Sequence, residues 1–282
     1  MSTHNPLKQY FRQPGIYIKL PSGGNFYPPG VLEMTANGEF PVYPMTARDE
    51  ITYRTPDALF NGQAVVEVIQ SCMPNIKNAW YLPSVDLDSI LVAIRIASYG
   101  HNMEFTSQCP ACANEEDRQL DLRTVIDVLR APDYSKSISQ GDLEIYFKPM
   151  TYKNVTDNNR SQYEEQRLLQ QLPELETNED LDRARTVKYG EVLKKMTDLT
   201  IKALAQSIAV IKTPQAQVTE PEFILDFLNN CDRKLFNRIS ENIIEKMSTA
   251  TIQPLKIECS ECSNKYDQPI TLNMTNFFVD AS

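Results

Sequence analysis

Hydrophobic and polar residues follow two different periods along the chain, and the periods predict both helices and strands. Residues 15–20 alternate as a strand does, whereas 63–73 and 87–98 carry apolar residues at helical spacing. The complete set of predicted elements comprises strands at 15–20, 40–43, 143–147 and 252–257, and helices that begin at 47 or span 63–73, 87–98, 124–130, 219–229 and 232–247.

Several of these helices carry start and stop signals. Thr46 followed by Asp49 fits a capping box, so a helix is expected to begin at residue 47. Asp86 or Ser84 is expected to cap the helix at 87–98, and Gly100 is expected to end it. These signals place the helix boundaries more firmly than the apolar pattern does alone.

The chain changes character between residues 151 and 212. Glycine nearly vanishes there, and charges of both signs alternate. This pattern is typical of long amphipathic helices with a solvated face. We therefore predict two long helices that form a hairpin, with the break near Pro173.

Residues 13–45 have the opposite character, with aromatic residues among prolines and glycines and little regular periodicity. The aromatic residues are Tyr17, Phe26, Tyr27, Phe40 and Tyr43. Such a segment is expected to bury little by itself and to lie on a neighbouring molecule, where aromatic side chains contribute strongly to binding.

Composition narrows the class of protein. The chain has 282 residues, enough for one large domain or two ordinary ones. A net charge of −9 argues against nucleic-acid binding, because nucleic-acid-binding proteins carry a basic field. No apolar run reaches the length of a membrane helix, and the N-terminus resembles no signal peptide. A reducing cytoplasm is therefore expected, where six cysteines point to a metal before disulfides.

Four of the cysteines form two matched pairs. Cys109 with Cys112, and Cys259 with Cys262, each read Cys-x-x-Cys, and the two segments superpose at an offset of 150 residues. In both, an Asn follows the second cysteine by two residues, an Asp by five and a Leu by ten. The shared spacing predicts one local structure used twice, a knuckle of strand, tight turn and returning strand. Asn114 and Asn264 are expected to take the left-handed position of the turns.

Two such knuckles complete a four-thiolate site for one structural zinc ion. Tetrahedral zinc with four Cys ligands, at about 2.3 Å each, has no open position for catalysis. An iron–sulfur cluster and a dithiol redox pair are the alternatives, although a redox pair would normally stand alone beside a βαβ pattern. Cys72 and Cys231 lie in helical patterns and are predicted to be small core residues.

No residues assemble a recognisable active site, so the chain is predicted not to be an enzyme. His4 and His101 are the only histidines, and His101 follows a helix-ending glycine. The sequence holds no dinucleotide fingerprint, no phosphate-binding loop and no nucleophile elbow. Asp86 and Asp88 stand at a helix start, where a cap is expected rather than a metal site.

Three segments together resemble a known family. They are Leu20-Pro-Ser-Gly-Gly-Asn-Phe-Tyr27, Val42-Tyr-Pro-Met-Thr-Ala-Arg-Asp-Glu50, and the stretch Ile90 to Gly100 followed by the first knuckle. The second knuckle running into Asn276-Phe-Phe278 also fits. These segments are similar to the baseplate hub proteins of contractile-tailed phages of the T-even type.

The resemblance implies a structural subunit of a phage tail baseplate, in the hub region, that acts by assembly with other tail and baseplate proteins. Its location would be the virion, and the host cytoplasm during assembly. No membrane, nucleic acid or small-molecule substrate is expected as a partner. An assembly factor absent from the virion is the alternative, and a zinc-ribbon nucleic-acid-binding protein is a weaker one because of the acidic charge.

The fold class predicted is α+β and mainly α, with a zinc ribbon made by two distant knuckles around a large helical insertion. The expected parts are an extended N-terminal arm at 1–45 and a helical core with the first knuckle at 46–122. A mainly helical insertion at 123–250 follows, and the second knuckle with a C-terminal tail occupies 251–282.

Overall fold

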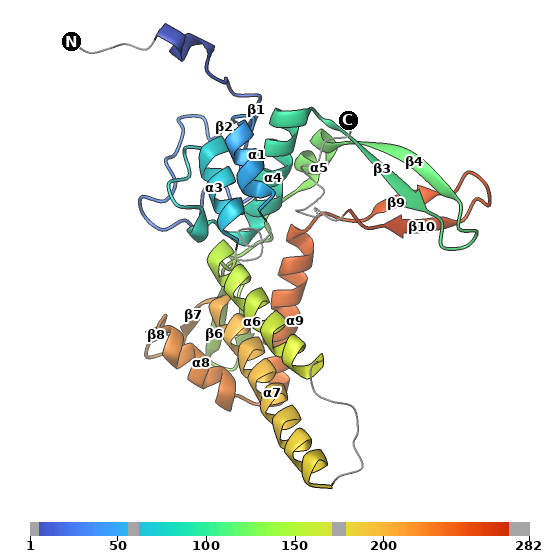
Figure 1. The fold of residues 1–282 in the computed structure, drawn as a ribbon. Coiled ribbons are helices and arrows are strands. Elements are labelled where there is room, and N and C mark those ends of the chain that lie inside the picture. The colour runs from blue at the N-terminus through green and yellow to red at the C-terminus, as the bar shows by residue number, and fades with distance from the viewer. Residues whose placement is uncertain (1–5, 56–61, 171–178, 271–282) are drawn as a thin grey trace. The chain divides into compact units, whose positions relative to one another are not determined.

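A computed structural model describes residues 6–55, 62–170 and 179–270, with the side chains of 179–185 left out (Figure 1). The chain forms two compact units: unit 1 contains residues 1–131 and 250–282, and unit 2 contains residues 132–249. The expected boundaries at 122/123 and 250/251 therefore lie at 131/132 and 249/250 in the structure.

Unit 1 is built around one buried helix. Its helical elements are η1 (Pro6–Tyr10), α1 (Ala47–Tyr53), α3 (Gln63–Cys72), η2 (Ala79–Tyr81), α4 (Ser84–Tyr99) and α5 (Leu122–Val128). Residues 90–94 of α4 are at most 1% exposed, so α4 is covered on every side there. It packs against α3 and α5 and against the strands of the N-terminal segment.

The helix caps confirm part of the sequence prediction. Thr46 and Asp49 form the capping box that begins α1, and Gly100, at φ 88°, follows the last residue of α4. The expected cap of α4 is wrong. The helix begins at Ser84 with Pro83 as its N-cap, and Asp86 in its first turn binds a loop from far away in the sequence.

The N-terminal segment belongs to the core of unit 1 rather than lying apart from it. Strands β1 (Ile16–Ile18) and β2 (Phe40–Val42) pair antiparallel, and Phe40 and Val42 are 1% and 0% exposed. Gly15 touches α4 so closely that a Cβ there would lie 2.9 Å from the Cα of Ala97. The expectation that residues 13–45 bury little by themselves is therefore wrong, although Tyr17 and Phe26 remain exposed.

A buried carboxylate holds the loop after β1. Asp86, which is completely buried, accepts hydrogen bonds from the backbone N–H of Ser22 at 2.7 Å and from its hydroxyl at 2.6 Å. The Tyr27 hydroxyl donates a third, at 2.9 Å. Gly24 adopts φ +84° within this loop, a conformation that favours glycine. The three donors offset the cost of burying the Asp86 carboxylate.

Unit 2 combines a sheet with four helices. Its elements are β5 (Ile138–Gln140), β6 (Leu143–Phe147), α6 (Tyr152–Gln170), α7 (Glu179–Gln206), β7 (Ile208–Lys212), β8 (Gln217–Val218), α8 (Pro221–Asn230) and α9 (Arg233–Ala250). The strands form an antiparallel sheet in the order β5-β6-β7-β8. Its core joins β6 and β7 to α7, α8 and α9.

Two of the predicted features of unit 2 need correction. Residues 208–212 were expected at the end of a helix, but they form β7, because β-branched Ile208, Val210 and Ile211 suit a half-buried strand. Thr219 was expected in the first turn of α8, whose N-cap is Glu220. The structure thus confirms an α+β fold, while the insertion holds a sheet as well as helices.

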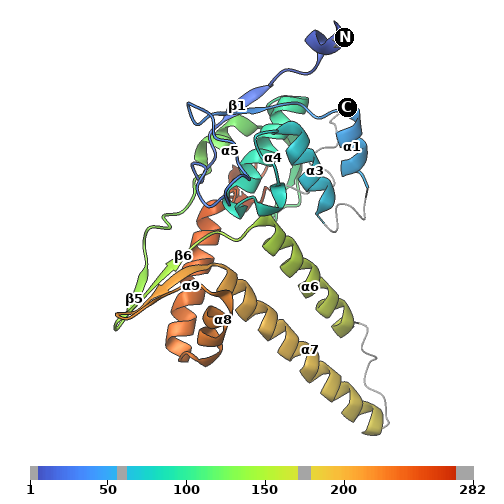
Figure 2. The ribbon, with the colours of Figure 1, turned by 90° about the vertical axis from the view of Figure 1, so that its left-hand side faces the viewer.

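The predicted long helices are confirmed. α6 and α7 lie side by side (Figures 1 and 2), and the Asn158 amide donates to the Gln206 side chain at 2.8 Å between them. Pro173, where the break was expected, lies outside the described residues. No described helix is both long and apolar enough to cross a membrane.

The carboxylate contact makes a stability prediction. Tyr27→Phe should lower the free energy of unfolding of unit 1 by about 1–2 kcal/mol, because it removes one donor from a buried carboxylate. Tyr17→Phe is the matched control, since Tyr17 is 60% exposed, and should change it by less than about 0.5 kcal/mol. Urea denaturation measures both, and equal effects would contradict the role given to Tyr27.

Asp86 also makes a pH prediction. Burial raises its pKa to about 6, although hydrogen bonds from Ser22 and Tyr27 act to lower it. The folded state therefore holds a proton that the unfolded chain releases, and the stability this gives is lost as pH rises through the folded pKa. From about pH 5.5 to about pH 7.5, the wild type should lose about 1 kcal/mol relative to Asp86→Asn. Parallel pH profiles of unfolding for the two proteins would contradict this.

Candidate metal centre

Two β-hairpins of unit 1 carry the four cysteines (Figure 1). The first consists of β3 (Asn102–Gln108) and β4 (Glu115–Asp121), and the second of β9 (Leu255–Glu258) and β10 (Lys265–Gln268). Ser107 pairs with Glu116 in the first, and Ile257 pairs with Tyr266 in the second. These pairs are equivalent at the offset of 150 residues, so the hairpins share one register. We call the two hairpins together the cysteine ribbon.

Each hairpin turns its alternate side chains toward the other hairpin. Ser107 and Leu120 are 1% and 7% exposed, Ile257 is 5% exposed, and their strand neighbours are exposed. The Ser107 hydroxyl lies 2.7 Å from the Tyr266 hydroxyl, which shows that the inner faces meet. The alternation of period two is what places the buried residues on one face.

The turns of the two hairpins have the same backbone geometry. The Cys109 N–H donates to the Asn114 carbonyl at 2.9 Å, and the Cys259 N–H donates to the Asn264 carbonyl at 3.0 Å. The left-handed residues are Ala113 at φ 58° and Ser263 at φ 55°, not the asparagines that the sequence suggested. Each asparagine instead supplies the carbonyl that closes its turn. The prediction of one local structure used twice is thereby confirmed.

The four sulfur atoms converge on one point. All of them lie within 4.8 Å of one another, with Cys109 Sγ 3.7 Å from Cys262 Sγ and Cys112 Sγ 3.6 Å from Cys259 Sγ. Sulfur atoms around one tetrahedral ion, at about 2.3 Å each, would lie about 3.8 Å apart. The donor set therefore fits a single four-coordinate ion, and the expected proximity of the two knuckles is confirmed.

The thiols have unlike proton affinities because they are close together. Burial acts to raise the pKa of Cys109, but backbone N–H groups of Cys112 and Ala111 and the neighbouring thiols lower it to about 6. The backbone N–H of Asn114 acts to lower the pKa of Cys112, but the other thiols and burial raise it to about 12. Four thiols in this arrangement titrate as a unit, and a divalent cation would favour the thiolate form of all of them.

Polar contacts around the sulfurs join the two hairpins, and the sequence analysis did not identify them. Gln268 Oε1 accepts from the Ser107 hydroxyl at 2.8 Å, and Arg118 donates to the Glu258 carbonyl at 2.7 Å. Arg118 and Gln268 occupy equivalent positions at the offset of 150 residues, so each hairpin reaches the other from the same place. Applied beyond the conserved letters, that offset was the signal that could have found them.

Other residues considered in the sequence take structural places. Cys72 is completely buried at the end of α3, and Cys231 is partly buried against the core of unit 2. The carbonyl of His101 accepts the Leu122 N–H at 2.8 Å, which joins the start of β3 to the start of α5. His4 lies outside the described residues.

Comparison with known proteins gives one match. The family described as T4 bacteriophage base plate protein matches residues 16–279, which is nearly the whole chain and includes both hairpins of the cysteine ribbon. Searches of curated proteins and of solved structures found no match. The match over both units and all four clustered cysteines shows that the chain belongs to the family of T4 bacteriophage base plate proteins.

Proposed function

We propose that this protein is a structural subunit of the hub region of a phage tail baseplate and that it acts by assembly rather than by catalysis. The observation that carries the proposal is the family match over residues 16–279, since membership implies a place in the virion tail and contact with other tail proteins. The hub location is our own proposal and rests on the sequence resemblance at residues 20–27, 42–50 and 90–100.

The proposal includes one structural zinc ion per chain. Cys109, Cys112, Cys259 and Cys262 would hold it, and their sulfur separations suit tetrahedral zinc. Four thiolates leave no position for water, so the ion would supply stability and no chemistry. The Asn264 amide, 3.9 Å from Cys109 Sγ, and the backbone N–H groups of the turns would stabilise the charged sulfurs.

The value of such an ion lies in where it joins the chain. β3–β4 and β9–β10 are short two-stranded hairpins, which are marginally stable on their own in water. Zinc would fasten them to each other and so close the long segment between them into a loop. The entropy cost of closing a loop grows only slowly with its length, so a large unit 2 can be carried between the hairpins.

A second candidate is an assembly factor that promotes baseplate formation and is absent from the finished particle. Family membership favours neither candidate over the other. We propose no catalytic role and no nucleic-acid partner, because a net charge of −9 opposes phosphate binding.

The zinc prediction concerns stoichiometry. Purified protein should contain about one zinc per chain by elemental analysis, and Cys259→Ser should abolish stable binding. Because zinc-finger peptides gain on the order of 10–16 kcal/mol from such a site, the ribbon should unfold with the loss of the ion. Amide hydrogen exchange should then speed up in β3–β4 as well as in β9–β10.

Cys231→Ser is the matched control, since Cys231 lies outside the four-sulfur cluster and is only partly buried. It should keep its zinc and its slow exchange. Iron in place of zinc would identify the wrong metal, while metal-free protein with four freely titrating thiols would refute the site.

The location prediction concerns particles. Quantitative mass spectrometry of purified virions should find the protein at a fixed whole-number ratio to the other baseplate proteins. An assembly factor would instead be present in infected cells and missing from virions. Tails that assemble normally without the gene product would contradict both candidates.

A further inference from the structure

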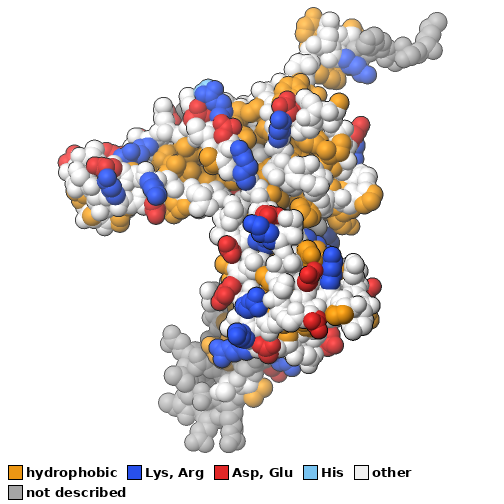
Figure 3. Space-filling model, turned by 180° about the vertical axis from the view of Figure 1, so that it is seen from behind, with side chains coloured by type: hydrophobic (Ala, Val, Ile, Leu, Met, Phe, Trp, Pro, Cys, Tyr) orange, Lys and Arg blue, Asp and Glu red, His pale blue; other side chains and the backbone are white. Residues whose placement is uncertain are grey.

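The segment at residues 6–11 exposes more apolar surface than the fold explains. Leu7, Tyr10 and Phe11 are 60%, 77% and 54% exposed, and η1 has no buried residue. In a 3₁₀-helix residues three apart lie on one face, so Leu7 and Tyr10 share a face. Figures 1 and 2 both show η1 standing away from the rest of unit 1. Figure 3 shows hydrophobic side chains gathered there, next to the grey N-terminal residues.

A specific attachment follows directly after these exposed residues. Arg12 donates to the Ser71 carbonyl at 2.7 Å and to the Ser71 hydroxyl at 2.9 Å, and it lies 3.4 Å from Asp49. It also bonds to the Pro44 carbonyl. The attachment therefore fixes residue 12 to α1 and α3 through a polar side chain and leaves the apolar side chains before it facing outward.

The charge of the segment points to the chemistry of what covers it. Residues 1–32 contain Lys8, Arg12 and Lys19 and no Asp or Glu, in a chain of net charge −9. Arg12 pairs with Asp49 and Lys19 with Glu39. Within the part of the chain that the structure describes, the Lys8 ammonium takes part in no ion pair or side-chain hydrogen bond. One cation therefore stands beside the three apolar side chains.

We propose that residues 6–11 dock into an apolar groove with an acidic rim on a different protein of the phage tail. Leu7, Tyr10 and Phe11 would fill the groove, and Lys8 would meet the rim. Large aromatic and aliphatic side chains buried in a pocket carry most of the binding energy of an interface, and a complementary charge fixes the orientation. The proposal rests on the proposed function, because that function supplies the partner proteins.

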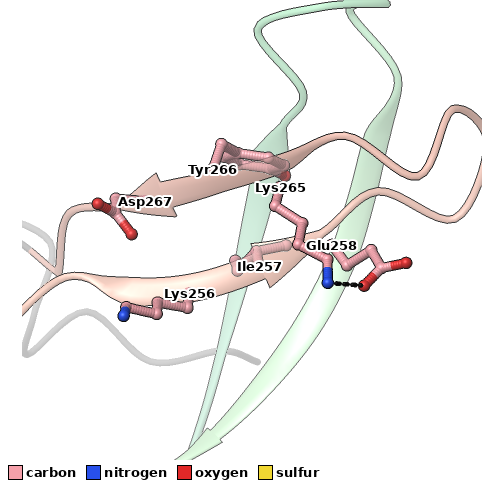
Figure 4. A pocket seen from close by; sticks show the side chains of 6 residues that line it. All are labelled: Lys256, Ile257, Glu258, Lys265, Tyr266 and Asp267. Carbon is pink, nitrogen blue, oxygen red and sulfur yellow. Dashed lines mark ion pairs between the residues drawn. The ribbon is translucent and has the colours of Figure 1, made fainter.

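A second copy of the chain suits this role less well. The described residues form a pocket of about 410 Å³ on the β9–β10 hairpin (Figure 4). Lys256 and Lys265 line it together with Glu258 and Asp267, and Lys265 is already paired with Glu258 at 3.4 Å. A rim with as many cations as anions gives Lys8 no net attraction. This pocket is therefore not the groove that the segment requires.

Photo-cross-linking in infected cells tests the proposal with the full chain. A benzophenone amino acid at position 10 should cross-link to one tail protein, at an apolar site bordered by Asp or Glu. The same residue at position 128 is the control, because Val128 is 69% exposed on α5 of the same unit. It should give no such product. Cross-linking to a second copy, to the same chain or to no protein would overturn the proposal.

Two sets of variants separate the apolar and charged contributions. Leu7→Ser with Phe11→Ser should reduce the cross-link at position 10 at least tenfold, as expected for the centre of an interface. Ile51→Ser with Val128→Ser changes two other exposed side chains of unit 1 and should leave it unchanged. Lys8→Glu should reduce it, whereas Lys8→Arg and Lys256→Glu should not.

These outcomes remain distinct from those of the proposed function. If virions lack the protein, the structural role fails, but the cross-link within infected cells still decides whether residues 6–11 dock on a tail protein. If virions contain the protein and the Leu7 and Phe11 variants cross-link and assemble normally, the docking proposal fails alone.

Discussion

The convergence of four sulfur atoms on one point is the constraint on which the rest of the chain depends. Two hairpins of equal register meet there, although 150 residues separate their cysteines. The chain leaves unit 1 after the first hairpin and returns before the second, so the ribbon fixes both ends of unit 2. Hydrogen bonds between the hairpins, such as Ser107 to Tyr266, are too few to do this alone. An ion bound by all four thiolates would supply the missing free energy.

A second, smaller constraint acts within unit 1. The buried Asp86 carboxylate collects the Ser22 N–H, the Ser22 hydroxyl and the Tyr27 hydroxyl, and so ties the loop after β1 to the first turn of α4. Leu20-Pro-Ser-Gly-Gly-Asn-Phe-Tyr27, one of the segments that resembled the family, has a physical explanation here. Its serine and tyrosine supply donors, and its glycines supply the left-handed backbone of the loop.

The sequence predicted features that depend on local signals or on exact spacing. The capping box at Thr46, the stop at Gly100 and the repeated knuckle were all visible in it, because each is a short-range pattern with a fixed geometry. Strand β7 was not predicted, since a short apolar run fits a buried helix as well as a strand until its partner β6 is known. The inner contacts of Arg118 and Gln268 were missed for the same reason, as they require the hairpins to be placed face to face.

The N-terminal aromatic residues show why composition alone could not separate core from interface. Phe40 and Tyr27 were grouped with Tyr17, yet Phe40 fills the core and Tyr27 bonds to Asp86, while Tyr17 is exposed. What distinguishes them is the strand pairing of β1 with β2 and the distant position of Asp86, neither of which is written locally. Once these contacts are subtracted, the unexplained apolar surface of this region shrinks from 13–45 to a few side chains, chiefly those before Arg12. A polar attachment followed outward by exposed apolar residues is costly for a protein alone in water, and it becomes favourable when a partner covers it.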